Sequence, residues 1–198
     1  MKVLGISGSL NPDGNTAFAV RRALEILSAE GVQTRYLSLA GREIHPCDGC
    51  WSCSAERRCK YDDDMEEILD GMRWCRGLIL GSPVHFGMVS GSLKVMMDRS
   101  IPLRPGYGEA MEMAGKLGGA IACGEFRNGG QETTLQNIHL FLLQQNMRVV
   151  SDGAGYSHMG GTIVGDALKD ELGLRTVENL ARNLLSMLRQ PGEQGEDE

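Results

Sequence analysis

The sequence predicts an α/β fold: a doubly wound, five-stranded parallel sheet with helices on both faces. Short apolar stretches alternate about five times with amphipathic stretches along the 198 residues, and this repetition requires parallel strands joined by crossover helices. The length suits one domain of this kind. A chain of this size buries about 70% of the surface of its unfolded state, so it needs no disulfide or metal to fold.

The predicted elements follow in order along the chain. Strands are expected at residues 3–6, 32–37, 77–81, 117–123 and 148–151. Helices are expected at residues 15–31, from residue 62 onward, and at 90–98, 131–146 and 166–189. The acids at 62–64 favour a helix start, because negative charge interacts well with the positive end of the helix dipole. One domain therefore spans residues 1–189.

One connection is much longer than this fold requires. Residues 39–61 form a loop of roughly twenty residues, whereas most connections between a strand and a helix have about 2–6. Residues 40–61, here called the cysteine segment, are therefore predicted to be an insertion into the domain. The segment holds four of the six cysteines, Cys47, Cys50, Cys53 and Cys59. In a cytosolic protein such a cluster indicates metal or redox chemistry. The two other cysteines, Cys75 and Cys123, are expected to be buried structural residues.

Composition argues against several classes of function. The formal net charge is −6, and four acids lie within residues 190–198, which are expected to form a disordered acidic tail. No basic stripe suits a nucleic acid, and no apolar run approaches the ~20 residues of a membrane span. The apolar stretch at the N-terminus is too short for a signal peptide. We therefore expect a cytoplasmic protein with no nucleic-acid or membrane partner.

Ligands of doubly wound sheets bind beyond the carboxyl ends of the strands, and the first loop there carries polar side chains. This loop, residues 8–16, is flanked by the donors Ser7, Ser9, Asn15 and Thr16 and leads into a helix N-terminus. Such an arrangement suits a phosphate monoester, although a polar turn with an Asn/Thr helix cap explains the same residues. The loop lacks the signatures G-x-x-x-x-G-K-[ST] and G-x-G-x-x-G, so nucleoside-triphosphate and dinucleotide sites are not expected.

The second loop, residues 82–91, follows the third predicted strand. Pro83 stiffens its turn, and Gly87 permits close approach of the backbone. Its backbone N–H groups suit the polar edge of a flavin, with His85 and Phe86 placed to touch the ring. Alternatively, His85 is an ordinary surface histidine and Phe86 belongs to the core.

The third loop, residues 124–133, follows the fourth predicted strand. Its paired glycines permit close approach, and Arg127 is suited to a carbonyl or a phosphate. Alternatively, it is an ordinary glycine-rich loop before a helix. The three loops strengthen one another as evidence, because the fold brings successive strand ends together.

These motifs resemble the NADPH-dependent FMN reductase superfamily. The resemblance rests on the first loop, on SPVHFGMVSGSLKVMMDR at residues 82–99 and on RNGGQETT at residues 127–134. The run Cys47-x2-Cys50-x2-Cys53-x5-Cys59, followed by an acidic stretch, is similar to the iron-sulfur flavoprotein branch of that superfamily. The resemblance covers residues 1 to about 150.

The resemblance implies a flavodoxin-like fold, FMN, a 4Fe-4S cluster held by the four cysteines, and a homodimer or homotetramer with the cluster near a flavin across a subunit interface. NAD(P)H is the candidate reductant, although the sequence does not decide whether a nicotinamide binds productively. By match of position the resemblance implies FMN contacts from Ser7, Ser9, Leu10, Asn15, Thr16, Ser82, Pro83, Val84, His85, Phe86, Gly87, Gly124, Glu125, Arg127 and Gly130. Many relatives carry a base early in the first loop, and this chain has none there, so phosphate binding would depend on neutral donors and the helix end.

The cysteine spacing itself is compatible with several chemistries. Four thiolates are the usual ligands of a 4Fe-4S cluster, and Cys59 most simply closes the same cluster because the chain has no second run. Coordination would also order a segment with few apolar residues. The cations Arg57, Arg58 and Lys60 would offset the negative charge of a cluster. Structural zinc, redox-active thiols and an empty site are the alternatives.

The leading hypothesis is therefore electron transfer between an iron-sulfur cluster and FMN, with a ferredoxin-like redox protein or a small molecule as partner. The cofactors supply this chemistry, so no general acid, base or nucleophile is assigned. An NAD(P)H-dependent FMN or quinone reductase without a cluster is the second hypothesis. A zinc-stapled binding module is the third.

Overall fold

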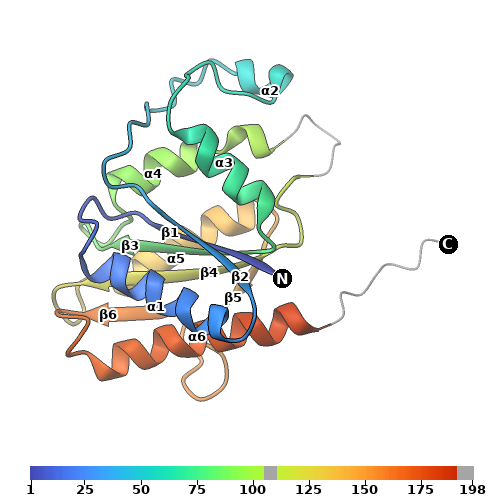
Figure 1. Ribbon diagram of the computed structural model, residues 1–198. Helices are drawn as coiled ribbons and strands as arrows, with labels where there is room; N and C mark the ends of the chain where they lie inside the picture. Colours follow the sequence, from blue (N-terminus) through green and yellow to red (C-terminus); the bar gives the residue numbers. More distant parts are fainter. Residues whose placement is uncertain (105–110, 191–198) are drawn as a thin grey trace.

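A parallel sheet forms the centre of the molecule (Figure 1). Its strands are β1 (Lys2–Ser7), β2 (Gln33–Ser38), β3 (Gly77–Pro83), β4 (Leu117–Gly124), β5 (Arg148–Val150) and β6 (Gly161–Val164). The order is β2-β1-β3-β4-β5, and β6 also pairs with β4. The predicted doubly wound parallel sheet is confirmed.

The fifth position in the sheet is shared by two short strands. β5 pairs with β4 from Leu117 to Gly119, and β6 pairs with it from Ile121 to Gly124. The five predicted strands are therefore present, and β6 is an addition that the sequence analysis did not predict. Residues 151–160 form the loop that joins β5 to β6.

The computed structural model describes residues 1–104 and 111–190. The acidic tail predicted at 190–198 lies outside the described residues, except for Gln190. Among the described residues, no helix combines the length and the apolar character needed to cross a membrane.

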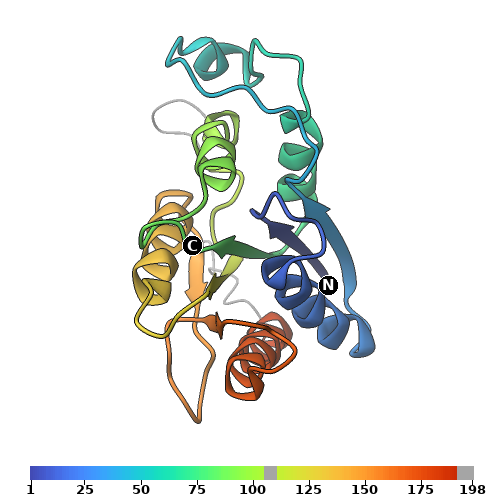
Figure 2. The ribbon, with the colours of Figure 1, turned by 90° about the vertical axis from the view of Figure 1, so that its left-hand side faces the viewer.

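Helices cover both faces of the sheet, as Figures 1 and 2 show. One face carries α1 (Asn15–Ala29) and α6 (Glu171–Arg189), and the other carries α3 (Met65–Trp74), α4 (Gly91–Asp98) and α5 (Gln131–Gln144). The short helices α2 (Ser52–Glu56) and η1 (Ile101–Leu103) complete the described part. The strand side chains divide accordingly, since Leu78 and Leu80 pack under α3 to α5 and Ile79 packs under α1 and α6.

Helix α6 begins later than the predicted residue 166. Asp170 ends the preceding turn, and its Oδ1 accepts a hydrogen bond of 2.9 Å from the N–H of Gly173. Its Oδ2 accepts another of 2.7 Å from Val164 at the end of β6. The correct start is Glu171, because Asp170 caps the helix and ties it to the sheet.

Gly160 fixes the position of β6. A Cβ at this residue would lie 2.4 Å from the backbone oxygen of Ala120 in β4. We expect Gly160→Ala to lower the free energy of unfolding by about 1–3 kcal/mol, because the strands must separate to admit the methyl group. Urea denaturation measures this loss. Gly91→Ala is the control, since a Cβ there meets no atom within 4 Å, and equal losses in both variants would contradict the prediction.

Candidate functional site

The chain changes direction across the sheet between β1 and β3. It leaves β1 for β2 on one side and later returns to β3 on the other. In doubly wound sheets, ligands bind in the crevice at this switch point, beyond the carboxyl ends of the strands. The first and second loops follow β1 and β3, so the predicted site residues stand at this crevice.

The first and second loops are bonded to each other. The N–H of Gly8 donates to Gly81 at 2.7 Å, and the hydroxyls of Ser90 and Ser92 both donate to the Gly8 carbonyl at 2.7 Å. A Cβ at Gly8 would lie 2.7 Å from Leu93 Cβ. Glycine is therefore required for this close packing of loop against helix.

The second and third loops also touch. The N–H of Val84 donates to the Cys123 carbonyl at 2.8 Å. Gly130 has a φ of +107°, and a Cβ there would lie 2.5 Å from Gly87 Cα. The structure thus brings all three predicted loops together through backbone contacts.

The first loop leaves the start of α1 open to a ligand. Gly14 precedes the helix and gives it no side-chain cap, so the first N–H groups of α1 have no partner within the helix. Ser7, Ser9 and Thr16 line this region and are buried, while Leu10 is exposed. Asn15 has a different role, because its amide donates to the Gly165 carbonyl at 2.8 Å and accepts from Ala167 at 3.0 Å.

The second loop turns tightly at its tip. His85 and Met88 exchange two backbone hydrogen bonds of 3.0 Å, with positive φ at Phe86 (+52°) and Gly87 (+75°). Phe86 is fully exposed and His85 is exposed, so the alternative that Phe86 belongs to the core is wrong. Ser82 is buried and shapes the loop, because its hydroxyl accepts from the N–H of Ser90 at 2.9 Å.

The third loop is organised by a glutamine. The side chain of Gln131 donates to the Phe126 carbonyl at 2.8 Å and accepts from the N–H of Gly129 at 3.1 Å. Glu125 and Arg127 project from this loop into solvent. Both charged side chains are therefore accessible beside the crevice.

The cysteine segment lies above α3 and α4, away from the sheet (Figure 1). Cys47 and Cys50 are exposed, Cys53 and Cys59 are half-buried, and all four are free thiols. Burial raises the pKa of the Cys53 thiol, and the charges of the other three cysteines raise it further. Cys53 therefore lies within electrostatic reach of the three other thiols.

Within the described part of the chain, no three His, Cys, Asp or Glu side chains are grouped closely enough to hold a single metal ion. A 4Fe-4S cluster sets a different requirement, because its four thiolates each bind a different iron. The predicted buried cysteines outside the segment are confirmed. Burial raises the pKa of Cys75 to about 11 and that of Cys123 to about 12.

Beside the cysteine segment lies an ion pair that the sequence analysis missed. Arg99, just after α4, pairs with Asp63 at 2.7 Å, and both side chains are buried. Burial opposes ionisation of Asp63, but bonds from Arg99, His45 and Met65 outweigh it and lower the pKa of this carboxyl. Local sequence patterns identified Asp63 only as one of three acids at a helix start. The overlooked signal is Arg99 itself, which directly follows α4. A charged side chain that is buried there requires a partner.

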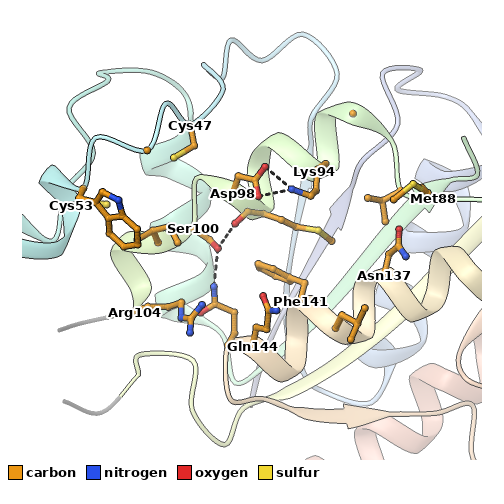
Figure 3. A pocket seen from close by; sticks show the side chains of 18 residues that line it. Cys47, Cys53, Met88, Lys94, Asp98, Ser100, Arg104, Asn137, Phe141 and Gln144 are labelled. Carbon is orange, nitrogen blue, oxygen red and sulfur yellow. Dashed lines mark hydrogen bonds and ion pairs between the residues drawn. The ribbon is translucent and has the colours of Figure 1, made fainter. Parts of the chain in front are cut away.

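A groove of about 800 Å³ joins the cysteine segment to the second loop (Figure 3). Cys47 and Cys53 line one side of it, Met88 and Val89 of the second loop line another, and Asn137 and Phe141 of α5 form the floor. None of the residues predicted to contact FMN is among the residues that line this groove. The groove therefore joins the cysteine segment to the end of the second loop, next in the chain to the predicted flavin contacts at residues 82–87.

The sequence matches the NADPH-dependent FMN reductase family over residues 1–161. It is also 48% identical, over 96% of this chain and 98% of the relative, to an iron-sulfur flavoprotein of Methanocaldococcus jannaschii. This chain belongs to the iron-sulfur flavoprotein branch of the NADPH-dependent FMN reductase family. It is a flavin-dependent oxidoreductase with FMN as its cofactor.

Solved structures place this family member in the flavodoxin-like fold. A structure of RosB with 8-demethyl-8-formylriboflavin-5'-phosphate bound superposes with a TM-score of 0.73 at 16% identity, covering 95% of this chain and 80% of that one. An archaeal flavodoxin gives 0.62 at 12% identity, covering 96% and 100%. The flavodoxin-like fold expected from the sequence is confirmed.

Contact between the second and third loops depends on Gly130. We expect Gly130→Ala to push the two loops apart and to weaken FMN binding by tenfold or more, because the new methyl group would overlap Gly87. Titration of the apoprotein with FMN, followed by flavin fluorescence, measures the dissociation constant. Gly31→Ala is the control, since Gly31 also has a positive φ (+81°) but no atom within 4 Å of a Cβ. If both variants bind FMN like the wild type, the contact between the second and third loops is not needed for FMN binding.

Proposed function

We propose that this flavoprotein transfers electrons between FMN and a 4Fe-4S cluster held by Cys47, Cys50, Cys53 and Cys59. The observation that carries this proposal is the shared groove, which the cysteine segment and the second loop line together. FMN exchanges one or two electrons and a cluster one at a time, and the protein supplies position and electrostatics. A ferredoxin-like protein or a small molecule would exchange electrons with the pair.

The first loop fits the phosphate of FMN. The uncapped start of α1 offers backbone N–H groups and a positive dipole end. The hydroxyls of Ser7, Ser9 and Thr16 stand beside it, and Asn15 would contribute its backbone N–H because its side chain is bonded to residues 165 and 167. Leu10 would cover the phosphate from the solvent side.

The second and third loops fit the ring. Backbone groups of residues 82–87 would meet its polar edge, and His85 and Phe86 would lie against it. Gly124 and Gly130 allow the third loop to approach closely, and the exposed side chains of Glu125 and Arg127 would flank the ring. The family description supports NAD(P)H as the reductant that reaches this open side.

The cysteine segment fits a cluster by its donor set. The segment carries four free thiols and few apolar residues, and thiolates are the ligands that iron-sulfur clusters use. The name of the relative that is 48% identical supports the same assignment.

The groove also supports a homodimer or homotetramer. Large apolar side chains are exposed around it, among them Trp51 (71%), Met88 (57%) and Leu140 (58%). Contiguous exposed apolar surface of this kind is typical of an interface. A second copy seated there would bring its own flavin loops towards the cysteines. The cytoplasmic location expected from the sequence stays a prediction.

Loss of the Ser9 hydroxyl tests the phosphate site. We expect Ser9→Ala to weaken FMN binding about tenfold or more, because a hydrogen bond to a charged group contributes about 1.5–3 kcal/mol. Riboflavin lacks the phosphate, so its affinity should stay unchanged in the same fluorescence titration. Equal weakening of both ligands would mean that Ser9 acts on the ring or on the loop, through the bond that it accepts from Asn11.

Counting cofactors tests the function. Protein purified without oxygen should contain about four irons, with matching acid-labile sulfide, and one FMN per chain. Cys59→Ser should lose most of the iron and keep FMN, because it removes one cluster ligand. Cys75→Ala is the control and should keep both, since Cys75 is buried under α3. FMN without iron, even after anaerobic reconstitution, would leave a simple flavin reductase as the better account, and zinc in place of iron would favour a structural metal.

A further inference from the structure

Hydrogen bonds join the loops at the carboxyl edge of the sheet in the order of the strands. The N–H of Gly8 in the first loop donates to β3, and that of Val84 in the second loop donates to β4. The connection between β6 and α6, residues 165–170, is here called the fourth loop. Its Gly165 donates to the carbonyl of Gly124, where the third loop begins, at 2.8 Å. Each bond follows a strand pair, because β1 lies beside β3, β3 beside β4 and β4 beside β6.

The side chain of Asn15 closes this series into a circuit. Asn15 is the first residue of α1, and its Nδ2 donates to the Gly165 carbonyl at 2.8 Å while its Oδ1 accepts from the N–H of Ala167 at 3.0 Å. Strands β3 and β4 separate β1 from β6 in the sheet, so strand pairing cannot join the first loop to the fourth. A change at Asn15 therefore opens the circuit and leaves the strand pairs intact.

Gly165 carries both links of the fourth loop. Its N–H donates to Gly124 and its carbonyl accepts from Asn15. Its φ of +67° is a conformation that glycine adopts without strain. One residue thus stands between the start of α1 and the start of the third loop, so a displacement at one side is passed to the other.

The fourth loop is the part that the loss of Asn15 would loosen. Helix α1 is held on the sheet by buried side chains such as Ala19 and Val20. In the fourth loop only Ala167 is buried, and residues 166, 168 and 169 are exposed. Without the bonds of Asn15, the fourth loop and the attached third loop gain freedom, while the N–H groups at the start of α1 stay in place.

We propose that Asn15 is a positioning residue of the flavin site, whose side chain holds the third loop at the flavin ring through Gly165. This inference rests on the proposed placement of FMN, with the phosphate at the first loop and the ring beside the second and third. A side chain that bound the phosphate directly would matter for FMN alone. A side chain that positions the third loop matters equally for riboflavin, which has the ring and lacks the phosphate.

Titration of the apoprotein with FMN and with riboflavin, followed by flavin fluorescence, tests the proposal. Asn15→Ala should weaken the binding of both flavins alike, by about tenfold, because two hydrogen bonds are lost. Arg22→Gln is the matched control, since it breaks a contact of α1 with α6 away from the loops, the pair of Arg22 with Glu178 at 2.6 Å. It should bind both flavins like the wild type. Wild-type riboflavin affinity in Asn15→Ala, or an equal loss in Arg22→Gln, overturns the proposal.

A second variant breaks one bond of Asn15 and keeps the other. In Asn15→Asp the carboxylate still accepts from the N–H of Ala167, but it cannot donate to the Gly165 carbonyl. Riboflavin is the ligand to compare, because it has no phosphate for the carboxylate to repel. Its affinity should fall by roughly threefold or more, because the lost bond is the one that leads to the third loop. An unchanged affinity overturns the proposal.

Hydrogen exchange of the apoprotein measures the coupling without any flavin. In Asn15→Ala the amides of residues 125–130 and 165–167 should exchange about tenfold faster, because local opening governs their exchange, and the amides of α1 should exchange as in the wild type. Unchanged exchange at 125–130, or an equal rise throughout the chain, overturns the proposal.

The proposed placement of FMN fails separately. If Gly130→Ala also leaves flavin affinity unchanged, the third loop does not lie at the ring, and both the placement and this inference are overturned. If Gly130→Ala weakens binding and Asn15→Ala does not, only this inference is overturned.

Discussion

Helix α4 is held at both ends by hydrogen bonds that reach across the fold, and both candidate cofactor regions take their positions from it. At its start, Ser90 caps the N–H of Leu93 and donates to the Gly8 carbonyl, which ties the first loop to the second. Just past its end, Arg99 donates to the His45 carbonyl and to Asp63, which lie on either side of the four cysteines in the chain. Eight helical residues span about 12 Å. The spacing between flavin loops and cysteines within one chain is therefore set by a rigid element.

A helix this short does not form by itself in water. Its order comes from the sheet, on which Leu93, Met96 and Met97 are buried. Each such side chain contributes about 1.5–3 kcal/mol when it leaves water, so packing holds the helix and the polar bonds at its ends fix its direction. A change in packing beneath α4 would therefore move the flavin loops and the cysteine segment together.

Local patterns in the sequence were sufficient to predict five of the strands, the three loops and the cysteine segment. The features that the sequence analysis missed depend on contacts between residues far apart in the chain. Buried strands such as 77–81 are apolar on both faces, which is visible in any short window. Strand β6 escaped because it has only four residues and begins with glycine, so only its pairing with β4 defines it. The Arg99–Asp63 pair joins residues 36 positions apart, and neither residue has a local pattern that names its partner. The same holds for Asn15, whose local setting indicated a phosphate donor and whose side chain instead reaches residues 165 and 167.

The hydrogen bonds among His45, Asp63 and Arg99 change what the proposed cluster would have to do for the cysteine segment. A segment of about twenty residues loses conformational entropy when four thiolates converge, and closing its ends is part of that loss. Because hydrogen bonds among His45, Asp63 and Arg99 already join the chain on either side of the cysteines, coordination of a cluster would have only the residues between them left to order. The backbone between these bonds is also constrained. Trp51 and Arg57, at the two ends of α2, adopt left-handed conformations, and such a conformation costs about 1–2 kcal/mol for a residue with a side chain. Metal binding at the proposed site would then be coupled to a small rearrangement and not to folding of the whole segment.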